Sequence, residues 1–333
     1  MKRLLFVLAL FFPVVSFAGY AEREEVQAFI AEMQTRHGLD GASLTRLFAQ
    51  AEPIPFVLRA IAPPADPRVK SWRNYRQRFI EPKRLKAGLD FWRRHQASLA
   101  KAEALSGVPA EFIVAIIGIE TIYGKQLGRF ATFTALATLA FDYPPRADLF
   151  RRELEALLLL ARDEQRSPMD YRGSYAGAVG LPQFLPSSIR AYAVDFDGSG
   201  QIDLTGSSDD AIGSVANFLK LHGWESGGPV TVKVGVGETA VDTLIAEGIK
   251  PVRRPAEMSD FGVVVPANAP DVPAALIDLV TPDADTEYWL GYQNFFVITR
   301  YNRSSFYAMT VFQFAQALLR EMSREQSRSV RLN

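Results

Sequence analysis

The chain has 333 residues, enough for one large domain or for two to three smaller ones, each with its own hydrophobic core. Hydrophobic residues make up 48% of the sequence and charged residues 22%, which is typical of a globular protein and excludes a disordered chain. Because 37 basic and 37 acidic residues give a formal net charge of zero, the sequence lacks the basic excess that marks nucleic-acid-binding proteins.

The first 18 residues have the pattern of an export signal. Lys2 and Arg3 precede an apolar run over 4–15, and small residues at 16 and 18 form a cleavage signal. We expect cleavage after Ala18, with an uncleaved N-terminal anchor as the alternative. The sequence has no cysteine, which excludes disulfides and a lipid anchor on an N-terminal Cys, and no later run is apolar enough to span a membrane. We therefore expect a soluble, exported protein.

The region 19–105 is predicted to be mainly helical. Apolar residues at 26, 29, 30 and 33 form one helical stripe, which should end near Gly38. Trp72, Tyr75 and Phe79 lie at helical spacing in a segment rich in arginine and aromatic residues. Such residues usually belong to a core, and stacking of Tyr75 on a sugar ring is the functional alternative.

An acid interrupts the apolar stripe of the next predicted helix. Ile113, Ile116 and Ile117 occupy positions i, i+3 and i+4, and the next position of the stripe is Glu120. Gly124 is expected to end this helix as a left-handed cap, which places Glu120 in its last turn. Apolar neighbours and the negative helix end would both raise its pKa, as a general acid at neutral pH requires. The alternative is a glutamate turned to the surface or paired with an arginine.

Two further helices, predicted over 131–138 and 148–163, precede a glycine-rich segment over 172–186. Its glycines permit backbone conformations that other residues avoid, and they allow a ligand to approach closely. Ser174 and Gln183 are the polar groups of this otherwise apolar segment. Gln183 is predicted either to bind a sugar amide or to cap a local turn, and a new helix should begin at Pro186.

An acidic loop follows that matches the first half of an EF-hand calcium site. Oxygen-bearing side chains occupy its positions 1, 3 and 5, and the backbone carbonyl of position 7 is a further ligand: Asp195, Asp197, Ser199 and Gln201. The acid expected at position 12 is replaced by Gly206, and the nearest substitute is Asp209. The loop is therefore either an enlarged variant that holds calcium or a degenerate turn.

The pattern of apolar residues changes after residue 228. Alternating apolar residues over 231–236, 261–265 and 275–280 predict a small β-rich region, with a further strand at 294–300, before helix returns at 305–321. Between them, Tyr301, Asn302 and Tyr307 form a polar and aromatic cluster. It would suit a carbohydrate site and would equally suit a strand–helix corner.

Taken together, these segments resemble the lytic murein transglycosylase B family, exported bacterial enzymes that cut the glycan strands of peptidoglycan. The resemblance includes the string IGIETIYGK and runs in order through residues 117–125, 135–144, 173–180, 183–188, 192–196, 210–217 and 299–302. The resemblance implies a mainly α (α+β) fold with a lysozyme-like helical core, an N-terminal helical region and a small β-rich domain. We accordingly divide the chain into a signal peptide (1–18), the N-terminal helical region (19–105), the core with its EF-hand-like loop (106–228), the β-rich domain (229–298) and a C-terminal return to the core (299–333).

The same resemblance assigns roles by position. Glu120 is expected to be the single catalytic acid and base. The polar saccharide contacts are expected to be Ser174, Gln183, Tyr301 and Asn302, and the aromatic walls Tyr75, Tyr123 and Tyr307. The family often has Trp at the position of Tyr123 and two arginines at the positions of Pro145 and Arg146, so only Arg146 retains the expected contact with the peptide stem or sugar. The EF-hand-like loop of the family supports Asp195, Asp197, Ser199, Asp209 and the Gln201 carbonyl as calcium ligands.

The expected reaction cleaves the bond between N-acetylmuramic acid and N-acetylglucosamine and leaves a 1,6-anhydro end. Ordinary glycosidases need two carboxyl groups, and Asp142 and Glu164 are the candidates for a second one. A hydrolytic muramidase and a non-catalytic peptidoglycan-binding protein are therefore the alternatives. Structural Ca²⁺ is the expected cofactor, without an organic one. The expected location is the periplasm and the expected partner is peptidoglycan, with cell-wall synthesis proteins as a further option.

Overall fold

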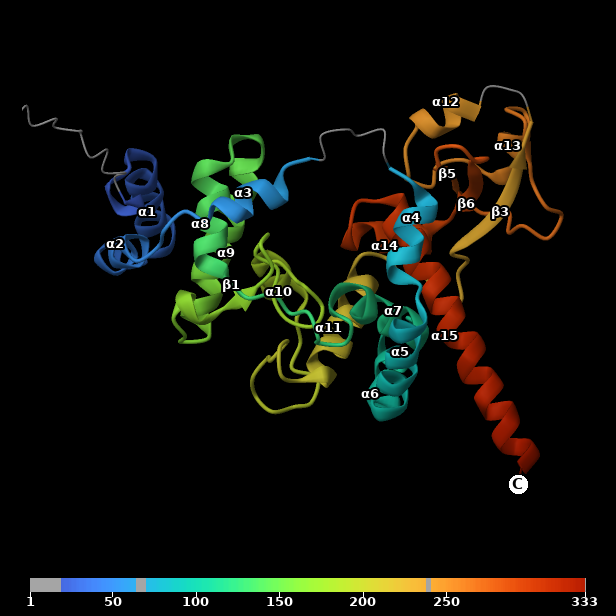
Figure 1. Cartoon of the computed structure of the whole chain (residues 1–333), viewed down its shortest axis with the longest axis horizontal. Helices are drawn as coiled ribbons and strands as arrows, with labels where there is room; N and C mark the ends of the chain where they lie inside the picture. Colours follow the sequence, from blue (N-terminus) through green and yellow to red (C-terminus); the bar gives the residue numbers. More distant parts are fainter. Residues whose placement is uncertain (1–18, 64–69, 238–240, 333) are drawn as a thin grey trace, which may run out of the picture.

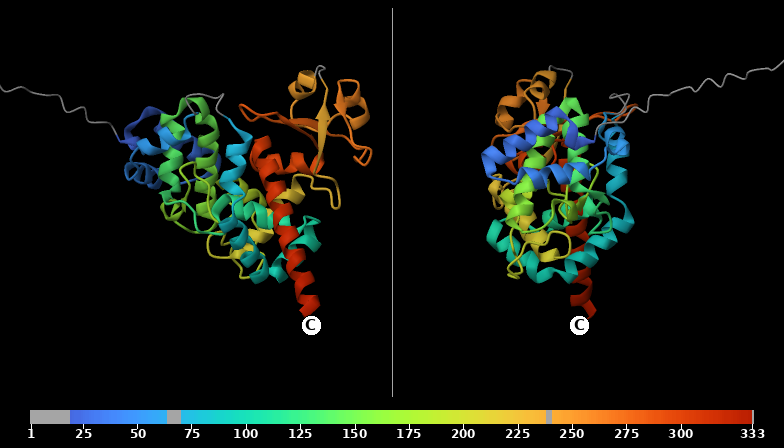
Figure 2. Two further views of the ribbon diagram at one scale, coloured as in Figure 1. Left: turned by 45° about the vertical axis from the view of Figure 1, so that its right-hand side comes forward. Right: turned by 90° about the vertical axis from the view of Figure 1, so that its left-hand side faces the viewer.

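The computed structural model describes residues 19–63, 70–237 and 241–332, so that the expected export signal lies outside the described residues. The chain is mainly helical and has two small antiparallel sheets, which confirms the expected fold class (Figure 1). Figures 1 and 2 show the first helices and the four-stranded sheet on opposite sides of a central group of helices.

The N-terminal helices cover one pair of long helices. The helices α1 (Glu24–His37), α2 (Gly41–Ala49) and α3 (Pro55–Ile61) gather around α8 (Thr132–Asp142) and α9 (Ala147–Asp163). The stripe expected in α1 is buried, and this helix ends at Gly38, whose φ of 65° is left-handed. Aromatic contacts join α2 to α8, because the ring of Phe48 packs against the rings of Phe133 and Phe141.

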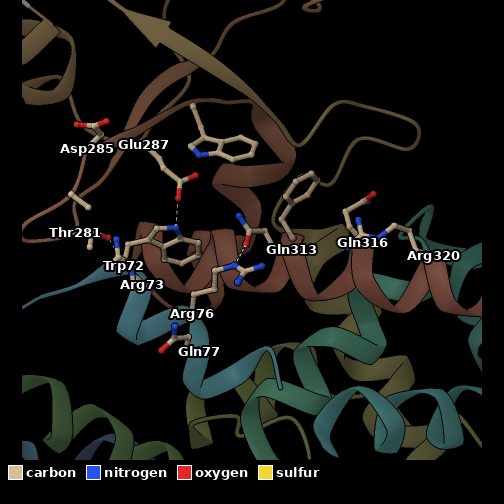
Figure 3. Close-up of a pocket in the computed structure, with 13 residues that line it drawn as sticks. Trp72, Arg73, Arg76, Gln77, Thr281, Asp285, Glu287, Gln313, Gln316 and Arg320 are labelled. Atoms are coloured by element: carbon tan, nitrogen blue, oxygen red, sulfur yellow. Dashed lines mark hydrogen bonds between the residues drawn. The ribbon is translucent and has the colours of Figure 1, made fainter. Parts of the chain in front are cut away.

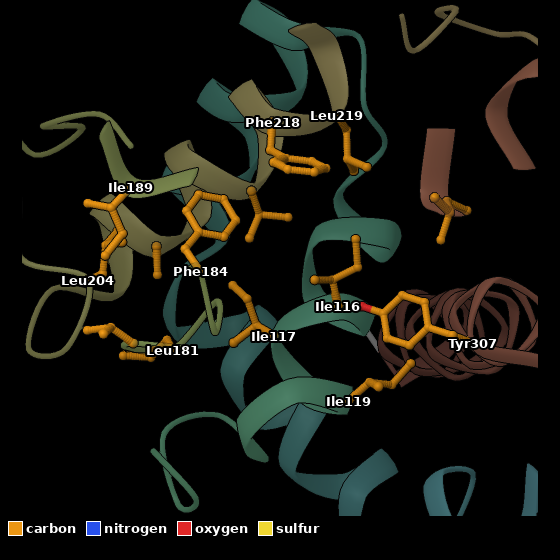
Figure 4. Packing of buried hydrophobic residues seen from close by; sticks show 14 of the residues in the cluster. Ile116, Ile117, Ile119, Leu181, Phe184, Ile189, Leu204, Phe218, Leu219 and Tyr307 are labelled. Atoms are coloured by element: carbon orange, nitrogen blue, oxygen red, sulfur yellow. The ribbon is translucent and has the colours of Figure 1, made fainter. Parts of the chain in front are cut away.

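A second group of helices surrounds α7 (Ala110–Thr121). It consists of α5 (Pro82–Arg94), α6 (Gln96–Ser106), α11 (Ser208–Leu221) and the long C-terminal helix α15 (Ser305–Leu332). All residues of α7 are buried except the two glutamates, Glu111 and Glu120. Figure 4 shows this packing, with Ile117 of α7 beside Phe184 and with Tyr307 pointing from α15 toward α7.

The four-stranded sheet is antiparallel in the order β4-β3-β6-β5. Its strands are β3 (Thr231–Val236), β4 (Val263–Val264), β5 (Ala275–Leu279) and β6 (Glu287–Gly291). Since side chains alternate across a strand, β5 serves two cores. Leu276 joins the small core of the β-rich region with α12 (Val241–Ala246) and α13 (Pro255–Ser259), whereas Ile277 and Leu279 join the main core.

The strand predicted over 294–300 is wrong, because this segment is the helix α14 (Gln293–Tyr301). Its buried residues fall at helical spacing, with Asn294, Val297 and Ile298 on one side. Asn294 also holds the start of the helix, since its amide bonds to the backbone of Glu225 and to the carbonyl of Gly228. The boundary expected at residue 298 therefore falls inside a helix that belongs to the main core.

Within 19–63, 70–237 and 241–332, no single helix is both long and apolar enough to cross a membrane. The helices α6 and α7 reach the required length and apolar character only together, and they meet at a bend of 115°.

Candidate active site

Glu120 lies in the last turn of α7 and is half-buried among apolar neighbours. The hydroxyl of Tyr307 donates a hydrogen bond to its Oε1 at 2.6 Å. Burial raises the pKa of Glu120 from 4.5 to about 7, and the bond from Tyr307 opposes part of that rise because it favours the carboxylate. In the described chain Glu120 has no arginine partner, so the alternative of an ion-paired glutamate is wrong.

The end of α7 differs from the expectation. The cap is Ile122 and not Gly124, and three consecutive residues, Ile122, Tyr123 and Gly124, have left-handed φ values of 51°, 57° and 86°. Such a run is uncommon for non-glycine residues and turns the chain sharply away from the helix axis. The preceding Thr121 is fully buried, and its hydroxyl accepts a bond from the amide of Gly124 at 3.1 Å.

Thr121 also joins the acid's helix to the glycine-rich segment. Its hydroxyl lies 3.0 Å from the carbonyl oxygen of Leu181, and Tyr301 donates to the next carbonyl, that of Pro182, at 2.5 Å. These two contacts hold the segment that carries Gln183 against the end of α7. Thr121 was not among the predicted site residues; its only signal in the sequence is a hydroxyl residue beside Glu120 in an otherwise apolar helix.

Ser174 and Gln183 shape the glycine-rich segment itself. The segment starts at β2 (Arg172–Gly173), which pairs with β1 (Phe130–Ala131), and Ser174 Oγ accepts from the amide of Ala178 at 3.1 Å. Gln183 has a left-handed φ of 51°, and its Nε2 donates to the carbonyls of Gly180 and Leu127 at 2.9 and 3.3 Å. Both predictions for Gln183 remain compatible with this geometry, since Nε2 caps a turn while Oε1 has no partner among the described residues.

Three of the predicted tyrosines surround the acid. The charge of Glu120 adds to the burial that raises the pKa values of Tyr75, Tyr301 and Tyr307, that of Tyr75 to about 12. The rings of Tyr301 and Tyr307 are nearly parallel, at 11° and 6.3 Å. The tyrosines therefore stay protonated at neutral pH, so that Tyr307 keeps a hydroxyl proton to donate to Glu120.

The remaining predicted contacts are not joined to Glu120 by any contact in the described chain. Tyr123 packs its ring on Phe91 at 5.0 Å, and its buried hydroxyl has no partner among the described residues. The guanidinium of Arg146 lies 5.3 Å above the ring of Phe150, and Asn302 is exposed at the end of α14.

Both candidates for a second acid are engaged elsewhere. Asp142 accepts from Tyr20 and forms an ion pair with Arg23 at 2.6 Å. Glu164 accepts from the hydroxyl of Tyr171 at 2.5 Å and lies 3.5 Å from Arg166. Neither carboxyl group contributes to the pKa of Glu120.

The loop after α10 (Pro186–Tyr192) brings the predicted oxygen ligands together. The carboxylate of Asp195 accepts from the amides of Gly198, Ser199 and Gly200 at 2.7–3.0 Å, while Ser199 Oγ donates to the carbonyl of Gln201 at 3.0 Å. The left-handed φ values of Gly198 and Gly200, 76° and 90°, close the loop. Hard oxygen donors in this arrangement fit calcium.

The acid that completes the loop in this structure is Asp210. One oxygen of Asp210 lies within 4.8 Å of oxygens of both Asp195 and Asp197, and its buried carboxylate accepts from three loop amides. The predicted ligand, Asp209, lies instead 3.5 Å from Nδ1 of His95. Asp210 was missed because it stands one residue beyond the substitute that the spacing suggested.

Comparison with known families and proteins gives a consistent result. Residues 21–316 match the family described as Transglycosylase SLT domain. The chain is 39% identical to membrane-bound lytic murein transglycosylase B of Escherichia coli (strain K12), over 90% of this chain and 84% of that protein.

The structure of this chain also matches solved structures of three relatives over about nine-tenths of its length. The soluble lytic transglycosylase SltB1 of Pseudomonas aeruginosa is 45% identical with a TM-score of 0.83, over 90% of this chain and 99% of that one. The Escherichia coli lytic transglycosylase Slt35 in complex with calcium is 39% identical with a TM-score of 0.77, over 90% and 94%. SltB3 of Pseudomonas aeruginosa, in complex with NAG-NAM-pentapeptide, is 30% identical with a TM-score of 0.75, over 89% and 79%.

Proposed function

The chain belongs to the transglycosylase SLT-domain family of lytic murein transglycosylases, enzymes that cleave peptidoglycan, and we propose that Glu120 alone serves as its catalytic acid and then as its base. The proposed bond is the β-1,4 link between N-acetylmuramic acid and N-acetylglucosamine. The proposed product carries a 1,6-anhydro-N-acetylmuramyl end.

The proposed reaction has two proton transfers and consumes no water. Protonated Glu120 gives its proton to the oxygen of the glycosidic bond, and that bond to C1 of the muramyl residue breaks. The N-acetyl carbonyl of the substrate stabilises the cation that develops at C1. The Glu120 carboxylate then takes the proton of the C6 hydroxyl, whose oxygen bonds to C1, and the acid is restored for the next cycle.

The observation that carries this proposal is the environment of Glu120. A residue that acts first as an acid and then as a base works best with a pKa near the working pH, and burial raises the pKa of Glu120 to about 7. The engagement of Asp142 and Glu164 elsewhere supports a single-acid route, because an ordinary glycosidase needs two carboxyl groups at the scissile bond.

We assign substrate binding to the residues that the family pattern marks: Ser174, Gln183, Tyr301, Asn302, Tyr75, Tyr123, Arg146 and Tyr307. Support differs among them. Tyr75 and Tyr307 share the electrostatic environment of Glu120, and Gln183 offers a free amide oxygen at the end of α7. For Tyr301 the support is weaker as a direct contact, because its hydroxyl already bonds to Pro182.

Mass spectrometry of peptidoglycan digests tests the chemistry. Products about 18 Da lighter than hydrolytic ones would support the anhydro route, because that route omits one water. Products with reducing ends would instead indicate a muramidase that uses water and a second acid. Binding without any product would indicate a non-catalytic peptidoglycan-binding protein.

We further propose that the loop over 195–210 binds a structural calcium ion, as the Slt35 complex suggests. The ligands would be Asp195, Asp197, the Ser199 hydroxyl and the Gln201 carbonyl. Either Asp210, as in this structure, or Asp209 after it leaves His95 would complete the set.

For location, we propose export to the periplasm, where peptidoglycan lies. The basic and apolar pattern of residues 2–15 supports this proposal.

A further inference from the structure

A second site lies outside the environment of Glu120. A cavity of about 590 Å³ opens between α4 (Trp72–Phe79), α15 and the segment that joins β5 to β6 (Figure 3). This volume is within the range of about 300–1,000 Å³ that is usual for ligand-binding pockets. Two hydrogen bonds hold α4 to the strands that line the cavity. The amide of Trp72 bonds to the carbonyl of Val280 at 2.8 Å, and its indole Nε1 bonds to Glu287 at 3.1 Å.

The cavity and the acid share two helices but use different faces. On α15, Tyr307 faces Glu120, whereas Gln316 lines the cavity nine residues later, and 9/3.6 = 2.5 turns place it on the opposite side. On α4, Arg73 and Gln77 line the cavity, two residues to either side of Tyr75. Phe306 contacts Tyr75 at 5.7 Å and Trp72 at 5.6 Å, so it lies between the two sites.

Charges of both signs line the cavity. Three arginines, Arg73, Arg76 and Arg320, line it, and none has a carboxylate partner within the described ranges. Asp285 and Glu287 lie at the end near β6, away from Arg320, as Figure 3 shows. A polyanion would meet the carboxylate of Asp285, since Glu287 already pairs with Lys233 at 3.3 Å. An uncharged sugar would leave the three arginines without a counter-charge, and Arg76 would keep only its bond to Gln313 Oε1. A ligand with carboxylates and one amine offers partners to both signs of charge.

The other lining groups favour a peptide. The side-chain amides of Gln77 and Gln316 can pair with peptide bonds, as can the amide nitrogen of Gln313, whose oxygen already accepts from Arg76 Nε. Trp289 and Phe312 supply apolar walls for aliphatic side chains. The Nε1 of Trp289 is buried and has no partner in the described chain, so it is a donor that a ligand carbonyl could satisfy.

We propose that this cavity binds a peptide stem of peptidoglycan, with its carboxylates on Arg76 and Arg320 and its free amine toward Asp285. The inference rests on the proposed function, which brings the chain to a polymer that carries such stems. Because the cavity lies on the opposite helix faces from Glu120, it holds a different stem from the one on the sugar that is cleaved. It therefore anchors the enzyme to the peptide-bearing wall while the glycan is cut.

The test uses calorimetry on the full chain with a synthetic stem tetrapeptide that is acetylated at its N-terminus. Its one free amine is then that of the third residue, which also carries a carboxylate. In R76Q/R320Q the Kd should rise at least about tenfold, since two charge-assisted bonds are lost. The control is Arg324→Gln, one turn further along α15, where the arginine pairs with Glu321 and does not line the cavity. Its Kd should match that of the wild type, and melting curves should show that both variants are folded.

A second arm uses the same peptide with its amine acetylated, which should bind more weakly because Asp285 loses its partner. The inference is overturned if the wild type does not bind the peptide, if R76Q/R320Q binds it unchanged, if acetylation has no effect, or if Arg324→Gln loses as much. Cleavage of intact peptidoglycan by the wild type is scored separately. Active enzyme without peptide binding rejects this inference alone, whereas an inactive wild type rejects the proposed function.

Discussion

Tyr307 donates a hydrogen bond to Glu120 across 187 residues of chain, at 2.6 Å. The bond brings the first turn of α15, the last helix, to the last turn of α7. It gives the acid a neutral donor in place of a cation, so the pKa of Glu120 can remain high, at about 7. A lysine or arginine at the same place would hold the glutamate ionised and remove its proton.

Glu120→Gln should abolish cleavage and leave the fold intact. Glutamine has the size of glutamate and can still accept from Tyr307, but it has no proton to exchange. Loss of general acid–base catalysis should lower turnover by at least about 10²–10⁴-fold. Release of muropeptides from purified peptidoglycan measures this loss, with the melting temperature as the control; substantial residual turnover would move the acid to another residue.

The activity of the wild type should fall as pH rises above about 7. Cleavage starts from protonated Glu120, so kcat/KM should drop about tenfold per pH unit above the pKa of this residue, which is about 7. Initial rates at fixed ionic strength between pH 5 and 9 would show this limb. A profile that is flat from pH 6 to pH 9 would contradict the assignment.

The raised pKa of Glu120 also predicts how the free energy of unfolding depends on pH. Because the folded-state pKa is raised above the ordinary value of 4.5, protonated Glu120 stabilises the fold fully below pH 4.5, and this contribution is lost as pH rises through about 7. The corresponding free energy is up to about 3 kcal/mol. Denaturant titrations of the wild type and Glu120→Gln should therefore diverge across this range in favour of the glutamine variant.

Tyr307→Phe should move the alkaline limb of the activity profile to higher pH. The tyrosine bond favours the carboxylate, so its removal raises the pKa of Glu120 further. Tyr301→Phe is the matched control, because that hydroxyl bonds to the carbonyl of Pro182 and not to the acid. Equal shifts in the two variants would show that the limb reports the packing of the tyrosines instead of the bond to Glu120.

Calcium removal should lower the melting temperature and leave the catalytic role of Glu120 unchanged. If the loop binds calcium, excess EGTA should lower the melting temperature by about 5 °C. Asp197→Asn should lose this response. Asp209→Asn and Asp210→Asn then identify the acid that completes the site, since only the ligand's replacement should weaken the calcium response. An unchanged melting curve in EGTA would argue against a bound ion.

Gly128→Ala should destabilise the fold more than Gly124→Ala. Both glycines have positive φ, 89° and 86°, and each substitution costs about 1 kcal/mol for that reason. A Cβ at residue 128 would also lie 2.1 Å from the carbonyl of Gly173, which precedes Ser174, whereas at residue 124 its nearest neighbour is 3.8 Å away. Gly128→Ala should cost a further 1–3 kcal/mol or so by overpacking and impair cleavage as well. Equal melting temperatures would contradict this.

The sequence allowed the prediction of features that depend on local pattern. The stripe that ends in Glu120, the helix at Pro186 and strand β5 each follow from periodicity or capping within a few residues. The strand predicted at 294–300 was wrong because its β-branched and aromatic residues favour strands. The same residues also have the helical spacing that the structure selects to bury Asn294 and Ile298.

What could not be predicted depends on contacts between distant segments. Tyr307 was expected as an aromatic wall, but its bond to Glu120 requires the docking of α15 on α7. The link from Thr121 to Leu181 depends on how the glycine-rich segment folds, and no spacing in the sequence encodes it. Likewise, Asp209 and Asp210 are neighbours in sequence, and only the turn into α11 decides which one faces the loop.

The place of Tyr307 in chain order has a consequence for when the protein becomes able to cut. The helix α15 is the last element of the described chain, so it is synthesised after every other helix of the core that holds Glu120. Until α15 docks on α7, Glu120 lacks the cover that this helix provides, and part of the burial that raises its pKa is missing. We therefore expect activity toward the wall only in molecules in which α15 has docked.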